Sequence, residues 1–293
     1  MANLKEIRTR INSVKSTRQI TSAMKLVAAS KLRKAQNAII ALRPYSYKIQ
    51  EIMGRLSDSL GEQSDNPYLR DSEVKNILLV SLASNKGLCG PFNANIIKET
   101  ERQVHENLHE LYKDGGVHLL TMGKKATEYF DRRDYDLIGN HDEIFDNLTF
   151  ENVAAIAQNL MKDFSDKKYD RIYIIYNKFI NPATQQVKVE QFLPLQPVQP
   201  EDSGNVETDY IFEPSKQEIV EQLIPKTLKI HLYQALLDSN ASEHGARMTA
   251  MHQATDNATE LVNDLQLKYN KARQEAITNE IIEVVSGAQA LSR

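Results

Sequence analysis

The last fifth of the chain carries the clearest hydrophobic pattern. Residues 226–286 contain no proline and a single glycine, Gly245, and are rich in residues that favour helices. Apolar or small side chains recur there at alternating steps of four and three residues, the heptad seam of a left-handed coiled coil. The seam comprises Leu237, Ala241, His244, Met248, Met251, Thr255, Ala258, Val262, Leu265, Tyr269, Ala272 and Ala276. At about 1.5 Å per residue this helix is roughly 90 Å long, so it needs a partner helix.

The first sixty residues have a matching pattern. Apolar positions step by three and four from Leu4 to Val14, and the same register resumes from Leu32 to Leu60. Between them the register falls on polar or small residues, namely Arg18, Thr21, Lys25 and Ala28. A rotated apolar stripe takes their place, formed by Ile20, Met24 and Val27. We therefore expect this stretch to face something other than its own coil, and we expect Pro44 to kink the helix without ending it.

The central region alternates between strand and helix patterns. Short apolar runs of the kind that are buried in a sheet predict strands at 75–83, 117–123, 171–179 and 186–193. Helical segments are expected at 93–113, 124–133 and 150–166. The last two strands should form a hairpin near Asn181 and Pro182. The alternation predicts an open, Rossmann-like α/β sheet with an antiparallel edge.

Turn-forming segments set the expected domain limits. An N-terminal helix over 1–60 and a C-terminal helix over 214–293 should form a long antiparallel coiled coil, with an α/β domain inserted over 75–210. Asn3 and Glu6 suit a capping box, and residues 61–67 suit a solvated linker. Three prolines predict an extended loop that runs on to residue 209: Pro194, Pro197 and Pro200. Pro214 suits the first turn of the returning helix, and Pro225 should bend it.

Charge is distributed unevenly. The formal net charge is −3, but residues 1–50 hold eleven Lys and Arg against one acid, Glu6, a local balance of 11 − 1 = +10. The remaining residues therefore carry −3 − 10 = −13. Clustered basic residues can bind nucleic acid, but here they surround a heptad helix with almost no aromatic residues, which favours a solvated face or an acidic protein partner.

The single cysteine, Cys89, excludes an internal disulfide framework and fits a reducing compartment. The first residues show no secretion signal, and no stretch approaches 18 apolar residues. We therefore expect a protein that works where it is made and does not insert into a membrane.

A glycine-containing loop follows the first predicted strand. Ser84–Asn93 lies between a strand and a helix, where phosphate-binding loops occur, but it lacks the spacing of a P-loop or of a dinucleotide-binding loop. A tight turn or a subunit contact is the favoured interpretation. Cys89 has no Cys-His-Asn signature around it, so a buried or contacting thiol is expected. The seven histidines show no metal spacing.

The far end of the last helix is apolar on all sides. Its aliphatic and small residues surround the helix axis, and such a helix must be buried by something. They are Ile277, Ile281, Ile282, Val284, Val285, Ala288, Ala290 and Leu291. Residues 269–278 lead into this end and are dense in hydrogen-bonding groups. We expect a sheath from other polypeptides, with polar contacts below it.

These features carry a resemblance to a known family. The chain resembles the gamma subunit of F-type ATP synthases over its whole length, most specifically at both ends. The matching segments are Met24–Leu32, Gly87–Gly90, Ala241–Met251, Tyr269–Gln274 and Ile277–Ile281. The family's loop usually reads Asp-Arg-Gly-Leu-Cys-Gly-Gly-Leu-Asn, and this chain departs from it at 85–86 and 91–92.

The resemblance implies a central rotor shaft with no catalytic residues and no cofactor of its own. Its implied partners are the alpha and beta subunits of the head, the epsilon subunit and the membrane c-ring, at the cytoplasmic face of a bacterial plasma membrane. The residues that it implies as partner contacts are Met24, Lys25, Cys89, Arg247, Arg273, Gln274 and Thr278. Met24, Lys25 and Cys89 would lie near an acidic lever of the beta subunit, and the other four would grip beta loops.

Two other functions stay open at this point. One is a nucleotide-binding α/β enzyme whose long helices form dimerisation arms, which requires a phosphate loop after residue 83. The other is a basic coiled coil that binds nucleic acid, which predicts strongly salt-dependent affinity for DNA through residues 1–50.

Overall fold

The computed structural model describes residues 4–60, 66–70, 72–195 and 216–291. The chain forms two compact units. The sheet unit comprises Ala29–Arg247, and the coil unit comprises Met1–Ala28 together with Met248–Arg293. Two helices contribute to both units, α1 (Leu4–Leu60) and α6 (Lys216–Leu291).

The sheet unit contains a five-stranded sheet in the order β3-β2-β1-β4-β5. The strands are β1 (Ile77–Leu82), β2 (Val117–Met122), β3 (Leu137–Asn140), β4 (Arg171–Asn181) and β5 (Thr184–Leu193). All neighbours are parallel except β4 and β5, which pair antiparallel as a hairpin. This confirms the predicted open sheet with an antiparallel edge. The prediction missed β3, whose four residues alternate between half-buried and exposed.

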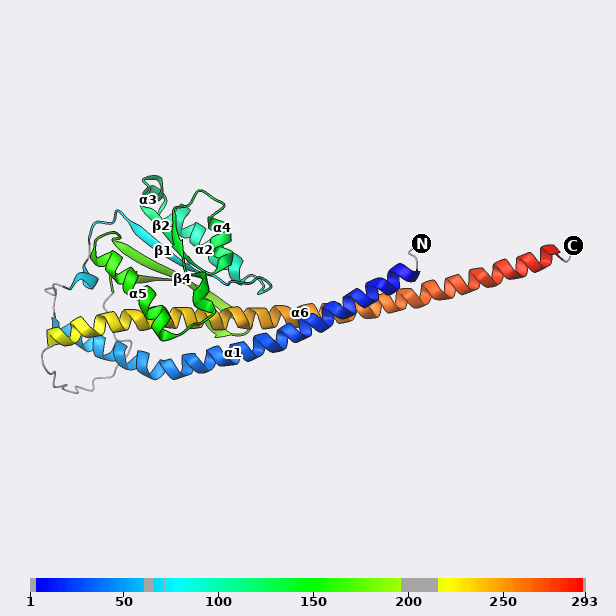
Figure 1. The fold of residues 1–293 in the computed structure, drawn as a ribbon, viewed down its shortest axis with the longest axis horizontal. Helices are drawn as coiled ribbons and strands as arrows, with labels where there is room; N and C mark the ends of the chain where they lie inside the picture. Colours follow the sequence, from blue (N-terminus) through cyan, green and yellow to red (C-terminus); the bar gives the residue numbers. More distant parts are fainter. Residues whose placement is uncertain (1–3, 61–65, 71, 196–215, 292–293) are drawn as a thin grey trace. The chain divides into compact units, whose positions relative to one another are not determined.

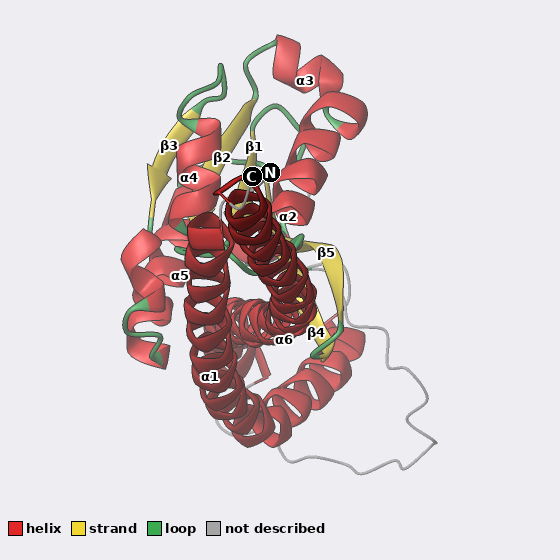
Figure 2. Ribbon diagram, turned by 90° about the vertical axis from the view of Figure 1, so that its right-hand side faces the viewer, coloured by secondary structure: helices red, strands yellow, loops and turns green. Residues whose placement is uncertain are grey.

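Alternate residues of β1 face opposite helical layers. Leu78, Val80 and Leu82 belong to a core with α5 (Phe150–Ser165), the first part of α6 and Ile49 of α1. Ile77 and Leu79 point the other way, into a core with α2 (Phe92–Arg102) and α4 (Lys124–Phe130). Figure 2 shows the yellow strands as one layer among the red helices of this unit. Because both faces are covered, all six residues of β1 are buried, as its apolar run requires.

The shorter helices follow the sequence pattern with one interruption. The segment predicted as one helix over 93–113 is α2, then a π-helical turn η3 (Gln103–Asn107), then α3 (His109–Lys113). Two 3₁₀ turns complete the unit, η2 (Pro67–Leu69) and η4 (Asp142–Phe145). Figure 1 shows α5 and the first part of α6 side by side below the strands.

The prolines inside the long helices do not end them. α1 continues past Pro44 and α6 continues past Pro225. The kink at Pro44 and the bend at Pro225 stay predictions. Several predicted features lie outside the described residues. They are the cap at Asn3, the linker over 61–65, the loop with Pro197 and Pro200, and the helix start at Pro214.

The coil unit pairs the start of α1 with residues 251–265 of α6 along the predicted heptad seam. From α6 the buried seam residues are Met251, Ala258, Val262 and Leu265, and from α1 they are Ile11, Thr21 and Ala28. The Thr21 and Thr255 hydroxyls form a hydrogen bond of 2.8 Å across the seam. Among the residues described, none of the helices combines the length and the apolarity that a membrane crossing requires.

Gly245 is required where α6 meets the β4–β5 hairpin. A Cβ there would lie 3.1 Å from Pro182 Cα and 3.4 Å from Phe179 Cε2, tighter than ordinary packing. We expect Gly245→Ala to lower the free energy of unfolding by about 1 kcal/mol. Gly287, on the same helix with nothing within 4 Å of its Cβ position, is the control. Gly287→Ala should instead be neutral or stabilise by up to about 1 kcal/mol. Equal effects of the two substitutions in thermal unfolding would contradict this assignment.

Candidate functional site

The loop between β1 and α2 is held by Arg247 of α6. The Arg247 guanidinium donates to two backbone carbonyls of the loop, Lys86 O at 2.9 Å and Gly87 O at 3.2 Å. Its other side pairs with the Glu243 carboxylate at 2.5 Å, one helical turn earlier. The side chains of Arg247 and Glu243 are 11% and 9% exposed. Because a guanidinium carries several N–H donors in a fixed plane, one side chain can satisfy all three acceptors.

Polar side chains inside the loop complete the network. The Ser84 hydroxyl donates to Lys86 O at 2.7 Å, and the Ser84 backbone N–H donates to Asn93 Oδ1 at 2.9 Å. The Asn93 amide donates to Cys89 Sγ at 3.3 Å. Cys89 is 1% exposed and packs with Phe92 and Ala246. Burial raises the pKa of the Cys89 thiol, so it is a buried thiol in this loop, as expected from the sequence.

Burial also sets the protonation of the α6 residues beside the loop. Burial raises the pKa of Glu243, and its effect outweighs the opposing effect of the adjacent Arg247 guanidinium. Burial, with repulsion from Arg247 and Lys31, lowers the pKa of His244 to about 4. A neutral His244 can therefore lie in the apolar seam beside Arg247 without a second buried positive charge.

This network lies where open α/β sheets bind their ligands. In such sheets the ligand crevice lies outside the carboxyl ends of the strands where the strand order reverses, which here is between β1 and β4. The Ser242 hydroxyl donates to Asn177 O of β4 at 2.9 Å, and the Asn177 amide donates to Phe92 O at 3.4 Å. Together with Arg247, these contacts place α6 over the crevice position. The loop also turns carbonyl groups, rather than N–H groups, toward Arg247, the opposite of a phosphate-binding loop.

In the coil unit, Met24 and Lys25 lie beside an exposed apolar strip. Met24 and Lys25 are half-buried, and Lys25 Nζ lies 3.4 Å from His252 Nδ1 of α6. The strip consists of Ile20, Leu26 and Val27, which are 60%, 68% and 58% exposed. The polar seam residue Thr21 stays inside the coil while these apolar neighbours face outward. Of the rotated stripe expected from the sequence, Ile20 and Val27 face outward, whereas Met24 is half-buried.

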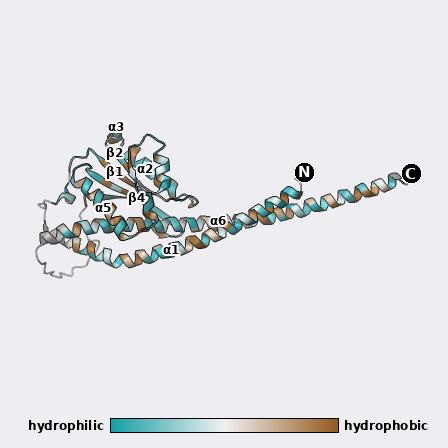
Figure 3. Cartoon of the chain, viewed as in Figure 1, coloured by the Kyte–Doolittle hydropathy of each residue, from teal (hydrophilic) through white to brown (hydrophobic). Residues whose placement is uncertain are grey.

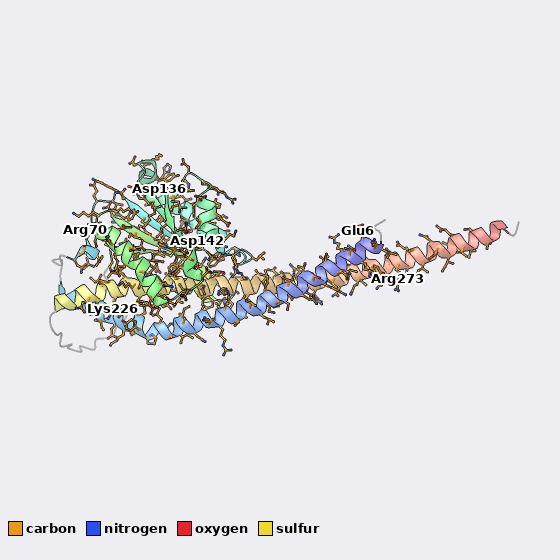
Figure 4. The ribbon with its side chains drawn as sticks, viewed as in Figure 1. Glu6, Arg70, Asp136, Asp142, Lys226 and Arg273 are labelled. Atoms are coloured by element: carbon orange, nitrogen blue, oxygen red, sulfur yellow. The ribbon has the colours of Figure 1, made fainter. Side chains whose placement is uncertain are left out.

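The end of α6 is exposed. Arg273, Gln274 and Thr278 are all exposed, and Figure 4 labels Arg273 on α6 and Glu6 near the start of α1. On the same turns and beyond, large aliphatic side chains are 48–67% exposed within the described residues: Ile277, Ile281, Ile282, Val284 and Val285. Figure 3 shows brown, hydrophobic residues along these last turns. The side chains of Ala290 and Leu291 lie outside the described residues.

The structure brings together only some of the site residues predicted from the sequence. Cys89 and Arg247 meet at the loop after β1, and Met24 and Lys25 are neighbours in the coil unit. Arg273, Gln274 and Thr278 lie along the end of α6. Sequence reasoning missed Glu243, Ser84 and Asn93. Glu243 could have been found, because it stands four residues before Arg247 on one helix face.

The fold and site define the class of this protein, which is a two-helix coiled coil with an inserted α/β sheet. Residues 3–291 match the ATP synthase family. The chain is 55% identical to the ATP synthase gamma chain of Christiangramia forsetii, with all of both chains covered. It is 56% identical to the gamma chain of Flavobacterium johnsoniae, again with full coverage of both.

Solved structures agree with this class. A chain of the Tetrahymena thermophila mitochondrial ATP synthase central stalk and c-ring structure aligns with a TM-score of 0.59 at 27% identity, over 80% of this chain and 99% of that chain. A chain of a Euglena gracilis mitochondrial ATP synthase structure has the same fold, with a TM-score of 0.68 at 21% identity, over 98% of this chain and 94% of that one. The chain therefore belongs to the ATP synthase family, among its gamma chains, the subunits of the central stalk.

Proposed function

We propose that the chain is a non-catalytic rotor that couples ion flow through a membrane ring to ATP synthesis in a head of alpha and beta subunits. The sheet unit would contact the c-ring and the epsilon subunit, and the coil unit would turn inside the head. The complex would lie at the cytoplasmic face of a bacterial plasma membrane, with this chain as a peripheral subunit. Each orientation of the rotor would favour a different state of each beta subunit through different contacts, which is a population shift.

The exposed apolar end of α6 is the observation that carries this proposal. Five large aliphatic side chains lie at one helix end, each about half or more exposed. Large contiguous apolar surfaces on soluble chains mark interaction sites. At about 100° per residue, the five side chains fall on one broad face of the helix, so the partner must cover that face. A head of alpha and beta subunits around the helix would supply such a surface.

The coil unit has a basic and apolar surface that suits a contact with an acidic partner. Lys25 stands beside the exposed strip of Ile20, Leu26 and Val27, on the strongly basic first helix. An acidic partner surface with apolar side chains would match both features. We therefore keep Met24 and Lys25 as proposed contacts to an acidic region of the beta subunits, and Arg273, Gln274 and Thr278 as proposed polar contacts just below the apolar end.

Contacts within the sheet unit argue against nucleotide binding and catalysis by this chain. The position where an α/β sheet of this order would hold a nucleotide is taken by Ser242 and Arg247 of α6. A nucleotide could enter only if these contacts opened. The rotor function is therefore favoured over the nucleotide-binding enzyme, and saturable micromolar ATP binding by the purified chain would favour the enzyme instead.

The test is co-purification with alpha and beta subunits. We expect the double substitution Ile281→Asp with Ile282→Asp to reduce recovery of the complex about tenfold, because two charges would enter an apolar partner surface. The helical circular dichroism of the isolated chain should not change, because both side chains are exposed in it. Glu280→Gln with Glu283→Gln is the control, since it alters neighbouring charges and keeps both isoleucines. Full recovery of the complex with the aspartate pair would show that no apolar partner surface covers this helix end.

A further inference from the structure

One acidic side chain of α6 is buried without a hydrogen-bond donor. Asp238 is 7% exposed, and within the described part of the chain no N–H or O–H group donates to its carboxylate. Three charged side chains face it from three other elements: Arg43 of α1, Lys178 of β4 and Glu190 of β5. The two cations are exposed, so solvent screens their charges. A buried carboxylate in these surroundings is poorly solvated when it is ionised.

The neighbouring carboxylate has the opposite environment. Glu190 Oε2 lies 3.1 Å from His231 Nε2, and the Tyr176 hydroxyl also donates to this carboxylate. These hydrogen bonds hold the pKa of Glu190 below its usual range, so Glu190 stays ionised. Burial, with the charge of Glu190 as a smaller cause, raises the pKa of Asp238 to about 6. Of the two carboxylates, Asp238 is therefore the one that binds a proton near neutral pH.

Contacts on both sides of Asp238 hold α6 against α1 and the β4–β5 hairpin. One turn before Asp238, the Ser46 hydroxyl of α1 donates to Gln234 Oε1 at 2.9 Å. One turn after it, the Ser242 hydroxyl donates to Asn177 O of β4 at 2.9 Å. Full hydration of the Asp238 carboxylate therefore requires α1 or the hairpin to separate locally from α6.

We propose that Asp238 is a proton-binding site that fastens α1 and the β4–β5 hairpin to α6 when it is occupied. The neutral acid packs at this position, whereas the ionised carboxylate favours local opening, because opening hydrates the charge. The proton is lost as the pH rises through about 6. Acidification therefore tightens this part of the sheet unit. The inference goes beyond the proposed rotor function and does not depend on it.

Amide hydrogen exchange of the full chain tests the effect on local opening. Exchange in β5 and in residues 39–49 of α1 is compared after correction for the intrinsic pH dependence of exchange. The opening constant of the original chain divided by that of Asp238→Asn should grow about tenfold from about pH 5 to about pH 7.5. This ratio cancels the titration of other groups, such as His244. Asp264→Asn, at an exposed position of the same helix, is the matched control and should give a constant ratio. A constant ratio with Asp238→Asn would overturn the proposal.

Carbon-13 NMR of the aspartate carboxyl groups measures proton binding without an Asp238 variant. One carboxyl resonance of the original chain should titrate with a midpoint near pH 6. Lys178→Gln removes an exposed cation that opposes the pKa shift, so this midpoint should rise by about 0.5 pH unit. The proposal fails if no aspartate carboxyl titrates above about pH 5, or if Lys178→Gln leaves the midpoint unchanged. Both measurements use the chain alone, so failure of the rotor function would not change them.

Discussion

Replacing Arg247 with alanine is expected to lower the free energy of unfolding of the chain by about 3 kcal/mol. The substitution leaves the Glu243 carboxylate buried without its partner at 2.5 Å, and it frees the carbonyls of Lys86 and Gly87. A buried charge without a partner costs far more than an exposed one, because the protein interior screens it weakly. Denaturant unfolding of the isolated chain measures the loss.

Two further variants separate the contributions to this loss. Adding Glu243→Gln to Arg247→Ala removes the unpaired charge, so we expect the double variant to recover a large part of the stability. Arg102→Ala breaks an ion pair with Glu99 at 2.7 Å whose arginine is 52% exposed, and it should lower the stability much less than Arg247→Ala. A loss with Arg247→Ala no larger than with Arg102→Ala would show that the pair contributes little to the fold.

This stability effect bears on the proposed contact between Arg247 and beta loops. The guanidinium already has three acceptors within the sheet unit. A fall in ATP turnover with Arg247→Ala is therefore informative only at temperatures where the isolated variant stays folded. Gln274 is exposed and has no such complication, so the corresponding measurement with Gln274→Ala reports on a partner contact directly.

The sequence predicted those parts of the fold that depend on periodic patterns. The heptad steps led to the buried seam from Met251 to Leu265, and the apolar run at 75–83 led to β1. β3 has no such run, because its four residues include Gly139 and alternate in exposure. The π turn that interrupts the segment predicted as one helix over 93–113 was not predicted from its apolar positions.

The candidate site depends on contacts that are distant in the sequence. The Glu243–Arg247 pair is local to one helix turn and could be anticipated. The hydrogen bond from Arg247 to Lys86 O joins residues 161 positions apart, and no periodicity indicates it. Leu88 is exposed and Cys89 is buried, and this difference depends on the left-handed backbone conformation of Leu88. A leucine in the sequence does not suggest that conformation.

Asp238→Asn is expected to raise the free energy of unfolding at about pH 7.5 by about 2 kcal/mol. Asp238 is 7% exposed on α6, and burial raises its pKa from 3.8 to about 6. Lys178 of β4 and Arg43 of α1 oppose this shift, and Glu190 of β5 adds to it. The folded chain therefore holds a poorly solvated carboxylate above about pH 6, and the amide removes that charge while keeping the shape of the side chain.

The sign of the pH dependence follows from the direction of this shift. Below pH 3.8 the carboxyl is protonated in both the folded and the unfolded chain, so the Asn and Asp chains differ little there. Between 3.8 and about 6 the unfolded chain ionises first, and the stability associated with Asp238 is lost as the pH rises through about 6. The advantage of Asp238→Asn should therefore grow from about pH 4 to about pH 7 and then level off.

The titration of His244 changes the free energy of unfolding in the opposite direction with pH, and it provides the control. Burial and the nearby cations lower its pKa from 6.5 to about 4, so its contribution to stability is complete above pH 6.5 and is lost as the pH falls toward 4. In the Asp238→Asn chain this loss is no longer masked, and the free energy of unfolding should fall steeply between pH 6.5 and about 4. Adding His244→Gln should flatten that fall. A stability profile for Asp238→Asn that runs parallel to the original profile from about pH 4 to about pH 7 would mean that the Asp238 carboxylate is solvated in the folded chain.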